Sequence, residues 1–123
     1  MNSFIINQKL PSLNETLRYN RTNAYMGAKF KKDIEEVIGW SIKQALASKS
    51  LHRVDAPVIV KIEWHEKTKK RDVDNIQSSA KFILDALVNQ GVLIDDSRKF
   101  VKQIYHEIID DTSDYVKIEL IEA

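Results

Sequence analysis

Two pairs of aspartates are the residues in this sequence that could hold a metal ion. Asp72 and Asp74 directly follow a basic stretch, and Asp95 and Asp96 come about twenty residues later. Divalent cations such as Mg²⁺ prefer oxygen ligands and are commonly held by one or two carboxylates together with water and substrate phosphate. Neighbouring carboxylates repel one another unless a cation lies between them. The two pairs therefore predict a divalent-metal site, provided that the fold brings them together.

The first pair also suits a purely structural role. Gln77 follows Asp74 by three residues, which is the spacing of a helix capping box, so Asp74 could simply begin a helix. If the segment is extended instead, Asp72 and Asp74 point to the same side and Val73 points away into the core. The two roles are compatible, because a capping aspartate is rigidly held. The second pair, taken alone, is typical of a turn.

Basic residues are concentrated just before the first acidic pair. Such a run can be a solvated loop, or it can bind a nucleic-acid backbone without reading the base sequence. Other basic residues lie near the N-terminus and after the second acidic pair. The candidate DNA-binding residues are Arg18, Arg21, Lys67, Lys69, Lys70, Arg71, Arg98 and Lys99.

The composition excludes several classes of protein. A chain of 123 residues that is 43% hydrophobic suits one domain, expected over residues 1–123. Without cysteine there are no disulfides or thiolate metal sites, and three scattered histidines argue against a zinc site. The net charge of +1 means that any DNA contact must come from local clusters. Since no signal peptide or membrane span is recognisable, we expect a soluble cytoplasmic protein without a nucleotide cofactor.

The apolar pattern predicts an α+β domain, with a small mixed sheet of about four strands and two main helices. Residues 10–28 show little periodicity and are expected to form a long loop of the kind that is usually functional. Residues 92–99 are expected to form a short extended piece and a turn. The expected helices cover about 28–49 and about 75–89, the second ending at Gly91. The expected strands are "SFIINQK", "PVIVKIEWHE", "FVKQIYHEII" and "YVKIELIE", the last two joined as a hairpin by "DDTSD".

The stretch "RDVDNIQSSAKFILDALVNQGVLIDDSRK" resembles the central signature of the RusA family of Holliday-junction resolvases. The matching elements are Asp-x-Asp-Asn at 72–75, Asp-Ala-Leu at 85–87, Gly91, and the pair Asp95 and Asp96. "PSLNE" at 11–15 is similar to the early Pro-Ser-x-Asn turn of the family. The resemblance is specific over residues 71–99 and weaker back to about residue 10.

The resemblance implies a small, homodimeric, Mg²⁺-dependent endonuclease that cuts four-way DNA junctions symmetrically, with Mn²⁺ as a possible substitute for Mg²⁺. It implies that Asp72, Asp74 and Asp96 are the essential metal-binding carboxylates, with Asp95 as a supporting ligand. The partner would be branched DNA, with the basic residues above binding its arms. The dimer surface is left open, although the first predicted helix, with an exposed Trp40, is a candidate.

The family also has a functional lysine early in the second helix. Some members place it three residues after the asparagine, where this sequence has Ser78. Lys81 lies one helical turn later and keeps the family's spacing to Asp85. An insertion of three residues nearly preserves the helix face, so we assign the catalytic role to Lys81. The alternative is a lysine at the edge of the apolar stripe that merely extends its amine into solvent.

Three other functions fit the same residues. The chain could be a non-catalytic DNA-binding module whose acids are only caps and turns. It could be a divalent-metal nuclease for other branched or flap DNA, since an acidic site binds one phosphate and not a whole junction. It could also be a structural dimerisation domain, which would not be stabilised by Mg²⁺.

Overall fold

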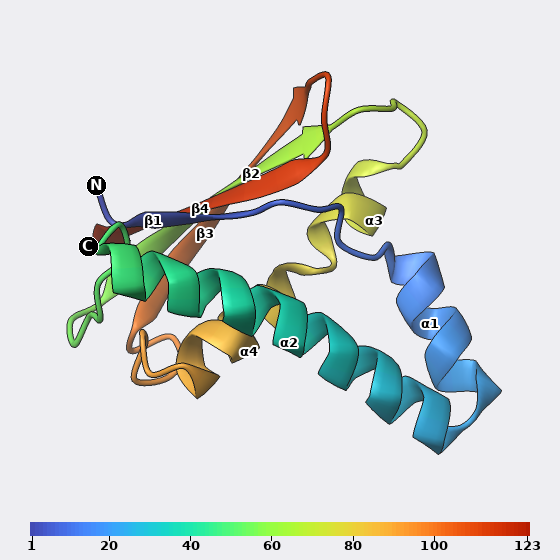
Figure 1. The fold of residues 1–123 in the computed structure, drawn as a ribbon, viewed down its shortest axis with the longest axis horizontal. Helices are drawn as coiled ribbons and strands as arrows, with labels where there is room; N and C mark the ends of the chain where they lie inside the picture. Colours follow the sequence, from blue (N-terminus) through green and yellow to red (C-terminus); the bar gives the residue numbers. More distant parts are fainter.

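The sheet contains four strands that come from the two ends and the middle of the chain (Figure 1). The computed structural model describes all residues, 1–123, with β1 (Ser3–Ile6), β2 (Val58–Glu66), β3 (Val101–Asp110) and β4 (Tyr115–Glu122). Their spatial order is β1-β4-β2-β3. β4 runs antiparallel to both β1 and β2, whereas β3 runs parallel to β2. The predicted mixed sheet is therefore confirmed.

The expected hairpin between the last two strands is wrong, because β2 lies between them. The turn that joins β3 to β4 crosses the end of β2, where the N–H of Asp111 donates to the carbonyl oxygen of Glu66 at 3.0 Å. The inward side chains of Val58, Val60 and Ile62 on β2 are fully buried. β2, in which no residue is exposed, lies between β3 and β4, and the acidic turn sequence alone does not reveal that a strand separates them.

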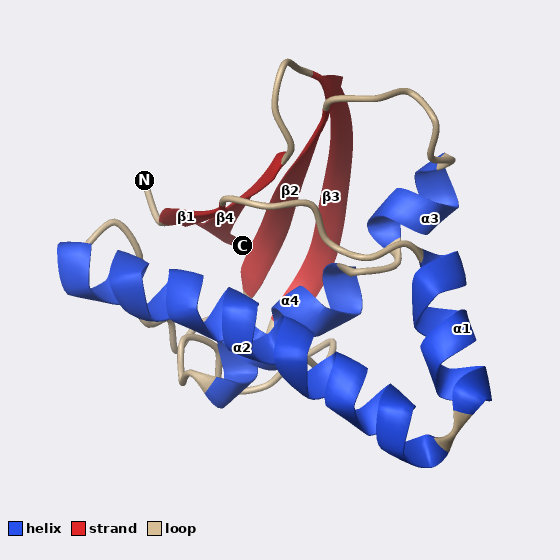
Figure 2. Cartoon of the chain, turned by 45° about the vertical axis from the view of Figure 1, so that its right-hand side comes forward, coloured by secondary structure: helices blue, strands red, loops and turns tan.

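Four helices, α1 (Leu13–Thr22), α2 (Ala24–Ser48), α3 (Val73–Gln77) and α4 (Ala80–Asn89), lie on one side of the sheet (Figure 2). α2 is the longest helix of the fold, and none is long and apolar enough to cross a membrane. The core is closed where α2 and α4 meet the sheet. The fully buried residues of these two helices are Ile38, Ile42, Ile83 and Leu87.

The prediction of a long loop over residues 10–28 is wrong. Ser12 begins α1 with a capping box, in which its Oγ accepts from the N–H of Glu15 at 3.1 Å and the Glu15 carboxylate accepts from the N–H of Ser12 at 3.3 Å. Asn23 then begins α2, because its Oδ1 accepts from the N–H of Met26 at 2.8 Å. No residue of α1 is buried and most of its residues are polar, so it lacks the run of core residues by which α2 and α4 were predicted.

The single helix expected over about 75–89 is instead two helices, α3 and α4, separated by Ser78 and Ser79. Both hydroxyls bond to main-chain carbonyls, Ser78 to Asn75 at 2.9 Å and Ser79 to Pro11 at 2.6 Å. Serine hydroxyls compete in this way with regular helix formation. The fully buried Ser79 thereby ties the start of α4 to the segment before α1.

The segment after α4 is made of turns and contains no strand, so the short extended piece expected over residues 92–99 is wrong. Gly91 adopts φ 73°, a conformation that is easy only for glycine, and ends the helix as expected. The N–H groups of Val92 and Leu93 both point back to the carbonyl oxygen of Leu87, at 2.9 and 3.2 Å. The chain thus folds back along α4 before it enters β3.

Candidate active site

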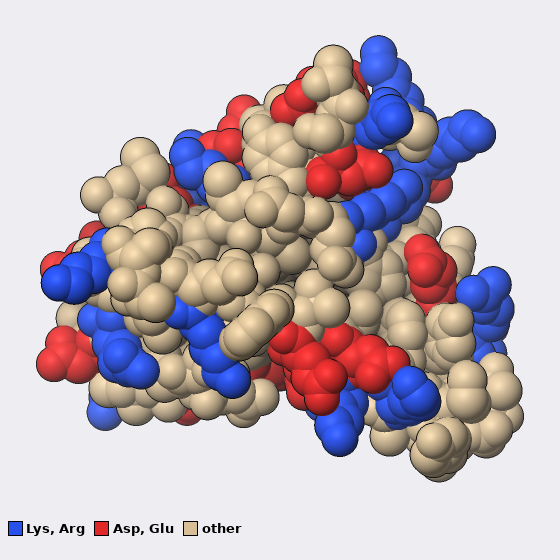
Figure 3. All heavy atoms as spheres, viewed as in Figure 1, with Lys and Arg blue, Asp and Glu red and all other residues tan.

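The predicted basic run lies in the connection between β2 and α3, which projects beyond one end of the sheet. Figure 3 shows lysine and arginine side chains gathered there, with acidic side chains beside them. Lys67, Lys69 and Lys70 are exposed. The Lys69 amine lies 3.6 Å from Oδ2 of Asp110, in a pair whose side chains are both largely exposed. Exposed pairs of this kind contribute little stability, so these amines are available for phosphate groups.

Arg71 differs from the lysines of this connection. Its Nε and Nη2 donate to the two carboxylate oxygens of Glu66 at 3.0 and 2.8 Å, and its Nη1 donates to the carbonyl oxygen of Leu10 at 2.8 Å. The two side chains are only 11% and 6% exposed. A bidentate, nearly buried arginine–carboxylate pair fixes the relative positions of the two side chains. Arg71 therefore joins the end of β2 to the N-terminal segment, and its contact with DNA stays a prediction.

Asp72 and Asp74 are both exposed, at the start of α3. Asp72, and not Asp74, occupies the capping position, and its side chain forms no capping hydrogen bond. The Asp74 carboxylate lies within the first turn and accepts from the N–H of Asn75 at 2.9 Å. The expected capping box with Gln77 is therefore wrong. Val73 is 56% exposed, so the expectation that it points into the core is also wrong.

The segment that carries these aspartates is bound to the turn that precedes α1. Besides the contacts of Arg71 and Ser79 with the carbonyl oxygens of Leu10 and Pro11, Oδ1 of Asn75 accepts from the N–H of Asn14 at 3.3 Å. The two stretches that resemble family motifs, at 11–15 and 71–75, are thus in direct contact. The early turn positions the aspartate-bearing segment and is not an independent site.

Lys81 projects from the first turn of α4 toward the turn that follows this helix. Its Nζ lies 2.9 Å from Oδ1 of Asp85 and 3.3 Å from Oδ2 of Asp96. The hydrogen bond with Asp85 and then that with Asp96 raise the pKa of Lys81 above 10.5, which keeps the amine charged. The hollow around these three side chains is lined by Lys31, Glu35, Lys81, Asp85, Val88, Asn89 and Asp96.

The structure joins Asp96 to Lys81, and it shows no contact of either residue with Asp72 or Asp74. No group of three acidic or histidine side chains lies close enough to hold a metal ion. The assignment of Asp72, Asp74, Asp95 and Asp96 as metal ligands therefore stays a prediction. Their chemistry suits Mg²⁺, because the Asp72 carboxylate has no hydrogen-bond partner and the others keep free oxygens on the surface.

The remaining predicted DNA-binding residues lie on two surfaces. Arg18 and Arg21 are exposed on α1, where they line a shallow hollow, and Arg98 and Lys99 are exposed in the turn before β3. Tyr19, which could have stacked on a base, packs instead on Phe30, with ring centres 4.5 Å apart. The four basic side chains are accessible to solvent, and their contact with DNA stays a prediction.

A buried histidine between two partly exposed carboxylates, beside the basic connection, was missed by sequence reasoning. His65 lies between Glu63 and Asp111, with ring-nitrogen distances of 3.1 and 2.8 Å, and stacks on Tyr115. Hydrogen bonds from the N–H of Thr112 and from His65 lower the pKa of Asp111, while burial and the Asp111 charge raise the pKa of Tyr115. The contact joins His65 on β2 to Asp111 in the turn that crosses the end of this strand. It depends on the order of the strands in the sheet, which the spacing of residues in the sequence does not reveal.

Comparison with known proteins bears on the whole chain. No individual curated protein matches it significantly. The family model described as endodeoxyribonuclease RusA matches residues 8–121, which spans all four helices and three of the four strands completely or nearly so. Together with the mixed sheet and the contact between the two signature stretches, this match shows that the chain belongs to the RusA endodeoxyribonuclease family.

Proposed function

We propose that this protein is a Mg²⁺-dependent endonuclease that resolves four-way DNA junctions as a homodimer. The observation that carries the proposal is the family match over residues 8–121. It is supported by the contact of Lys81 with Asp96 and by the exposed Asp72 and Asp74 next to three exposed lysines. The reaction would be hydrolysis of one phosphodiester in each of two opposing strands.

In this proposal Asp72, Asp74 and Asp96 hold the metal, with Asp95 in support. When bound, Mg²⁺ would acidify a water molecule and neutralise charge on the phosphate. The contacts of Lys81 support two roles. Its charge offsets that of Asp96 before DNA binds. Its amine can also stabilise the charge that develops on the phosphate.

The DNA arms would be held by the lysines of the β2–α3 connection together with Arg18, Arg21, Arg98 and Lys99. Contacts of this kind position the backbone without reading its sequence. The dimer has a physical reason, because a four-way junction is nearly two-fold symmetric and a two-fold dimer offers two equivalent sites. Each protomer would then cut one of the two symmetry-related strands.

The decisive experiment compares the wild-type chain with Asp72→Asn on a synthetic four-way junction with Mg²⁺. We expect the wild type to cut two opposing strands, and the variant to bind the junction with similar affinity but not to cut it. Asp114→Asn is the control, because Asp114 is a partly exposed carboxylate that accepts a hydrogen bond from the N–H of Lys67 and has no proposed role in the chemistry. Normal cutting by Asp72→Asn in Mg²⁺ would remove Asp72 from the proposed metal ligands.

Two further outcomes separate the alternatives. A protein that binds junctions but cuts none under any divalent cation would be a binding module. A protein that cuts three-way or flap DNA as fast as four-way junctions, in direct competition, would be a nuclease with a broader choice of branched DNA. Linear duplex DNA serves as the negative substrate in the same competition.

A further inference from the structure

Trp40 is a large apolar side chain left exposed on α2 among charged neighbours, and Tyr25 at the start of the same helix is the other large exposed side chain. Trp40 is 65% exposed, whereas the only other tryptophan of the chain, Trp64, is 1% exposed. Tryptophan, with tyrosine and arginine, is enriched at the energetic centres of protein interfaces. An exposed tryptophan in the middle of the longest helix therefore indicates a surface that is covered by a partner.

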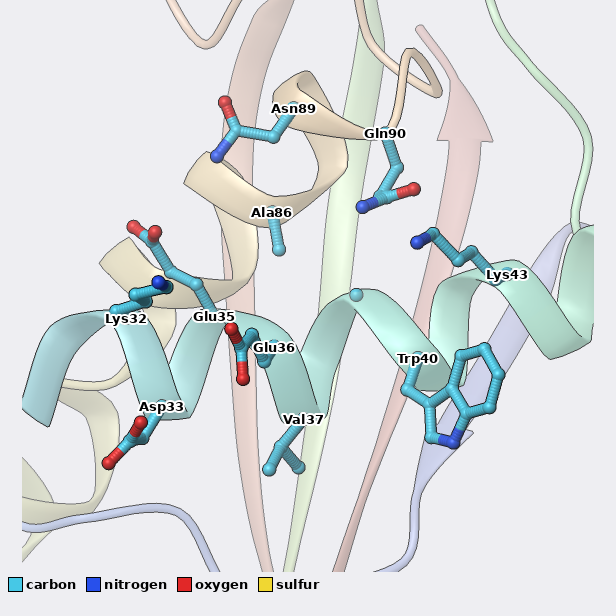
Figure 4. Close-up of a pocket in the computed structure, with 11 residues that line it drawn as sticks. Lys32, Asp33, Glu35, Glu36, Val37, Trp40, Lys43, Ala86, Asn89 and Gln90 are labelled. Carbon is cyan, nitrogen blue, oxygen red and sulfur yellow. The ribbon is translucent and has the colours of Figure 1, made fainter. Parts of the chain in front are cut away.

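Trp40 lies at the edge of a hollow of about 750 Å³ between α2 and the end of α4 (Figure 4). Gly39, Ala86 and Val37 contribute to its lining, with Gln90 and Asn89 at the α4 side. The same surface thus carries a projecting side chain and a recess next to it. A two-fold interface requires this combination, because each copy must offer the same patch to the other and the patch must fit itself.

The unpaired charges on either side of Trp40 indicate that the partner is a second copy of this chain. Glu36 and Lys43 flank it at spacings of four and three residues, on one face of α2. Neither forms an ion pair within the chain, although the next pairs along the helix, Lys29 with Asp33 and Lys31 with Glu35, are closed at 2.9 and 3.9 Å. Figure 3 shows acidic and basic side chains side by side over the middle of this helix. Such a mixed surface repels part of any phosphate backbone, so it is poorly suited to DNA.

We propose that this face of α2 is the interface between two copies of this chain, with the two α2 helices antiparallel. A two-fold axis near Trp40 places Glu36 of each copy opposite Lys43 of the other. Two ion pairs then form across the interface, and neither residue is left unpaired. The two positions are about 10 Å apart along the helix, and the Trp40 side chains lie between the two ion pairs. Each indole then enters the recess of the other copy.

The interface would also adjoin the candidate active site. The hollow beside Trp40 and the hollow around Lys81 and Asp96 share Glu35 and Asn89 in their linings. A second copy seated on Trp40 therefore lies next to Lys81 without covering the β2–α3 connection at the far end of the sheet. This inference rests on the homodimer of the proposed function and names its surface.

The test is sedimentation equilibrium across a range of protein concentrations. We expect a dimer for the wild type and a monomer for Trp40→Ser. Glu36→Lys and Lys43→Glu, each alone, should weaken the dimer by about tenfold or more, because each places like charges across the interface twice. The double variant should recover the dimer, since the pair is then exchanged and not lost. Glu107→Lys, on exposed β3, is the matched control and should not change dissociation.

A wild type that stays monomeric, a dimer that ignores both single exchanges, or a double variant that remains a monomer would each overturn the inference. Circular dichroism of every variant shows that loss of the dimer is not loss of the fold. Junction cutting separates this result from the proposed function. A monomer that still cuts refutes only the interface, and a dimer with charge-exchange rescue that never cuts refutes only the proposed activity.

Discussion

Lys81 at the start of α4 contacts Asp96 in the turn beyond this helix, with Nζ 3.3 Å from Oδ2. The contact forms because Gly91 ends the helix and the chain folds back along it. Asp85, one helical turn after Lys81, holds the same amine at 2.9 Å and directs it toward Asp96. The lysine that follows the serine pair therefore lies beside a predicted metal ligand. Ser78 instead bonds to the carbonyl oxygen of Asn75.

The first expectation concerns which of these two residues acts in the reaction. We expect Lys81→Ala to slow junction cutting by about 10- to 100-fold, as removal of one charge-stabilising group does in other enzymes, with little change in junction binding. Ser78→Ala should cut at nearly the wild-type rate, because its hydroxyl only caps a local carbonyl group. Single-turnover kinetics at saturating enzyme measures both. The opposite ranking would show that Ser78 occupies the position of the family lysine.

The second expectation concerns the pair formed by Arg71 and Glu66. We expect Arg71→Met to lower the free energy of unfolding by about 3 kcal/mol or more, because it leaves the Glu66 carboxylate buried without a partner. Replacing Glu66 by Leu in the same chain should restore part of the loss, since the second charge is then gone as well. Urea titrations measure the differences. Lys69→Met, whose ion pair is exposed, should change stability little, and an equal loss there would contradict the structural assignment of Arg71.

The third expectation concerns the exposed lysines of the β2–α3 connection. Replacing Lys67, Lys69 and Lys70 together by Ala should weaken binding to four-way junctions at low salt and flatten the dependence of affinity on salt concentration. Each lost phosphate contact should reduce the slope of log affinity against log salt by about 0.9 for duplex arms. Fluorescence anisotropy at several salt concentrations gives the slope. An unchanged slope would mean that these lysines are a solvated loop.

The fourth expectation concerns pH and His106. The Nε1–H of Trp64, an almost fully buried side chain, donates to Nδ1 of His106 at 3.0 Å, and burial lowers the pKa of His106 below 6.5. The unfolded chain therefore takes up a proton at a higher pH than the folded chain. Stability conferred by neutral His106 is complete above about pH 6.5 and is lost as the pH falls through that value toward the lowered folded pKa.

The measurement is the free energy of unfolding between about pH 7.5 and 5. His106→Gln keeps an acceptor for Trp64 but does not titrate, so its stability should fall less than that of the wild type over this range. His52 and His65 are present in both proteins, and the difference between the two profiles isolates His106. Identical profiles would show that His106 has the same pKa in the folded and unfolded chains.

The sequence predicted the elements that bury several apolar residues and missed α1, which buries none. Apolar residues that alternate or recur at helical spacing, and that are buried in the structure, predicted β2, β4, α4 and most of α2. α1 has no buried residue, and only the capping box of Ser12 and Glu15 marked its start. The placement of β2 between β3 and β4 depends on how well each strand packs in the centre, which is a property of the whole sheet and not of the acidic turn.

The candidate site was predictable as a set of residues but not as a geometry. The run of cations suggested one phosphate-binding loop, yet Arg71 meets a glutamate that lies five residues earlier at the end of a strand and leaves the lysines to solvent. The side-chain direction of Val73 was also misjudged, because Asp74 belongs to a helical turn and not to an extended segment. Local backbone shape decides such directions, and residue types alone do not.

The order β1-β4-β2-β3 also has a consequence for how the protein is made. The only neighbour of β1 in the sheet is β4, so residues more than a hundred positions apart are paired, with Phe4 opposite Ile118. During synthesis, the hydrogen bonds between β1 and β4 can form only after residues 116–119 have left the ribosome. Contacts between such distant residues slow folding. Ribosome-bound chains that stop before Tyr115 should therefore leave β1 open to proteases, and chains that include β4 should protect it.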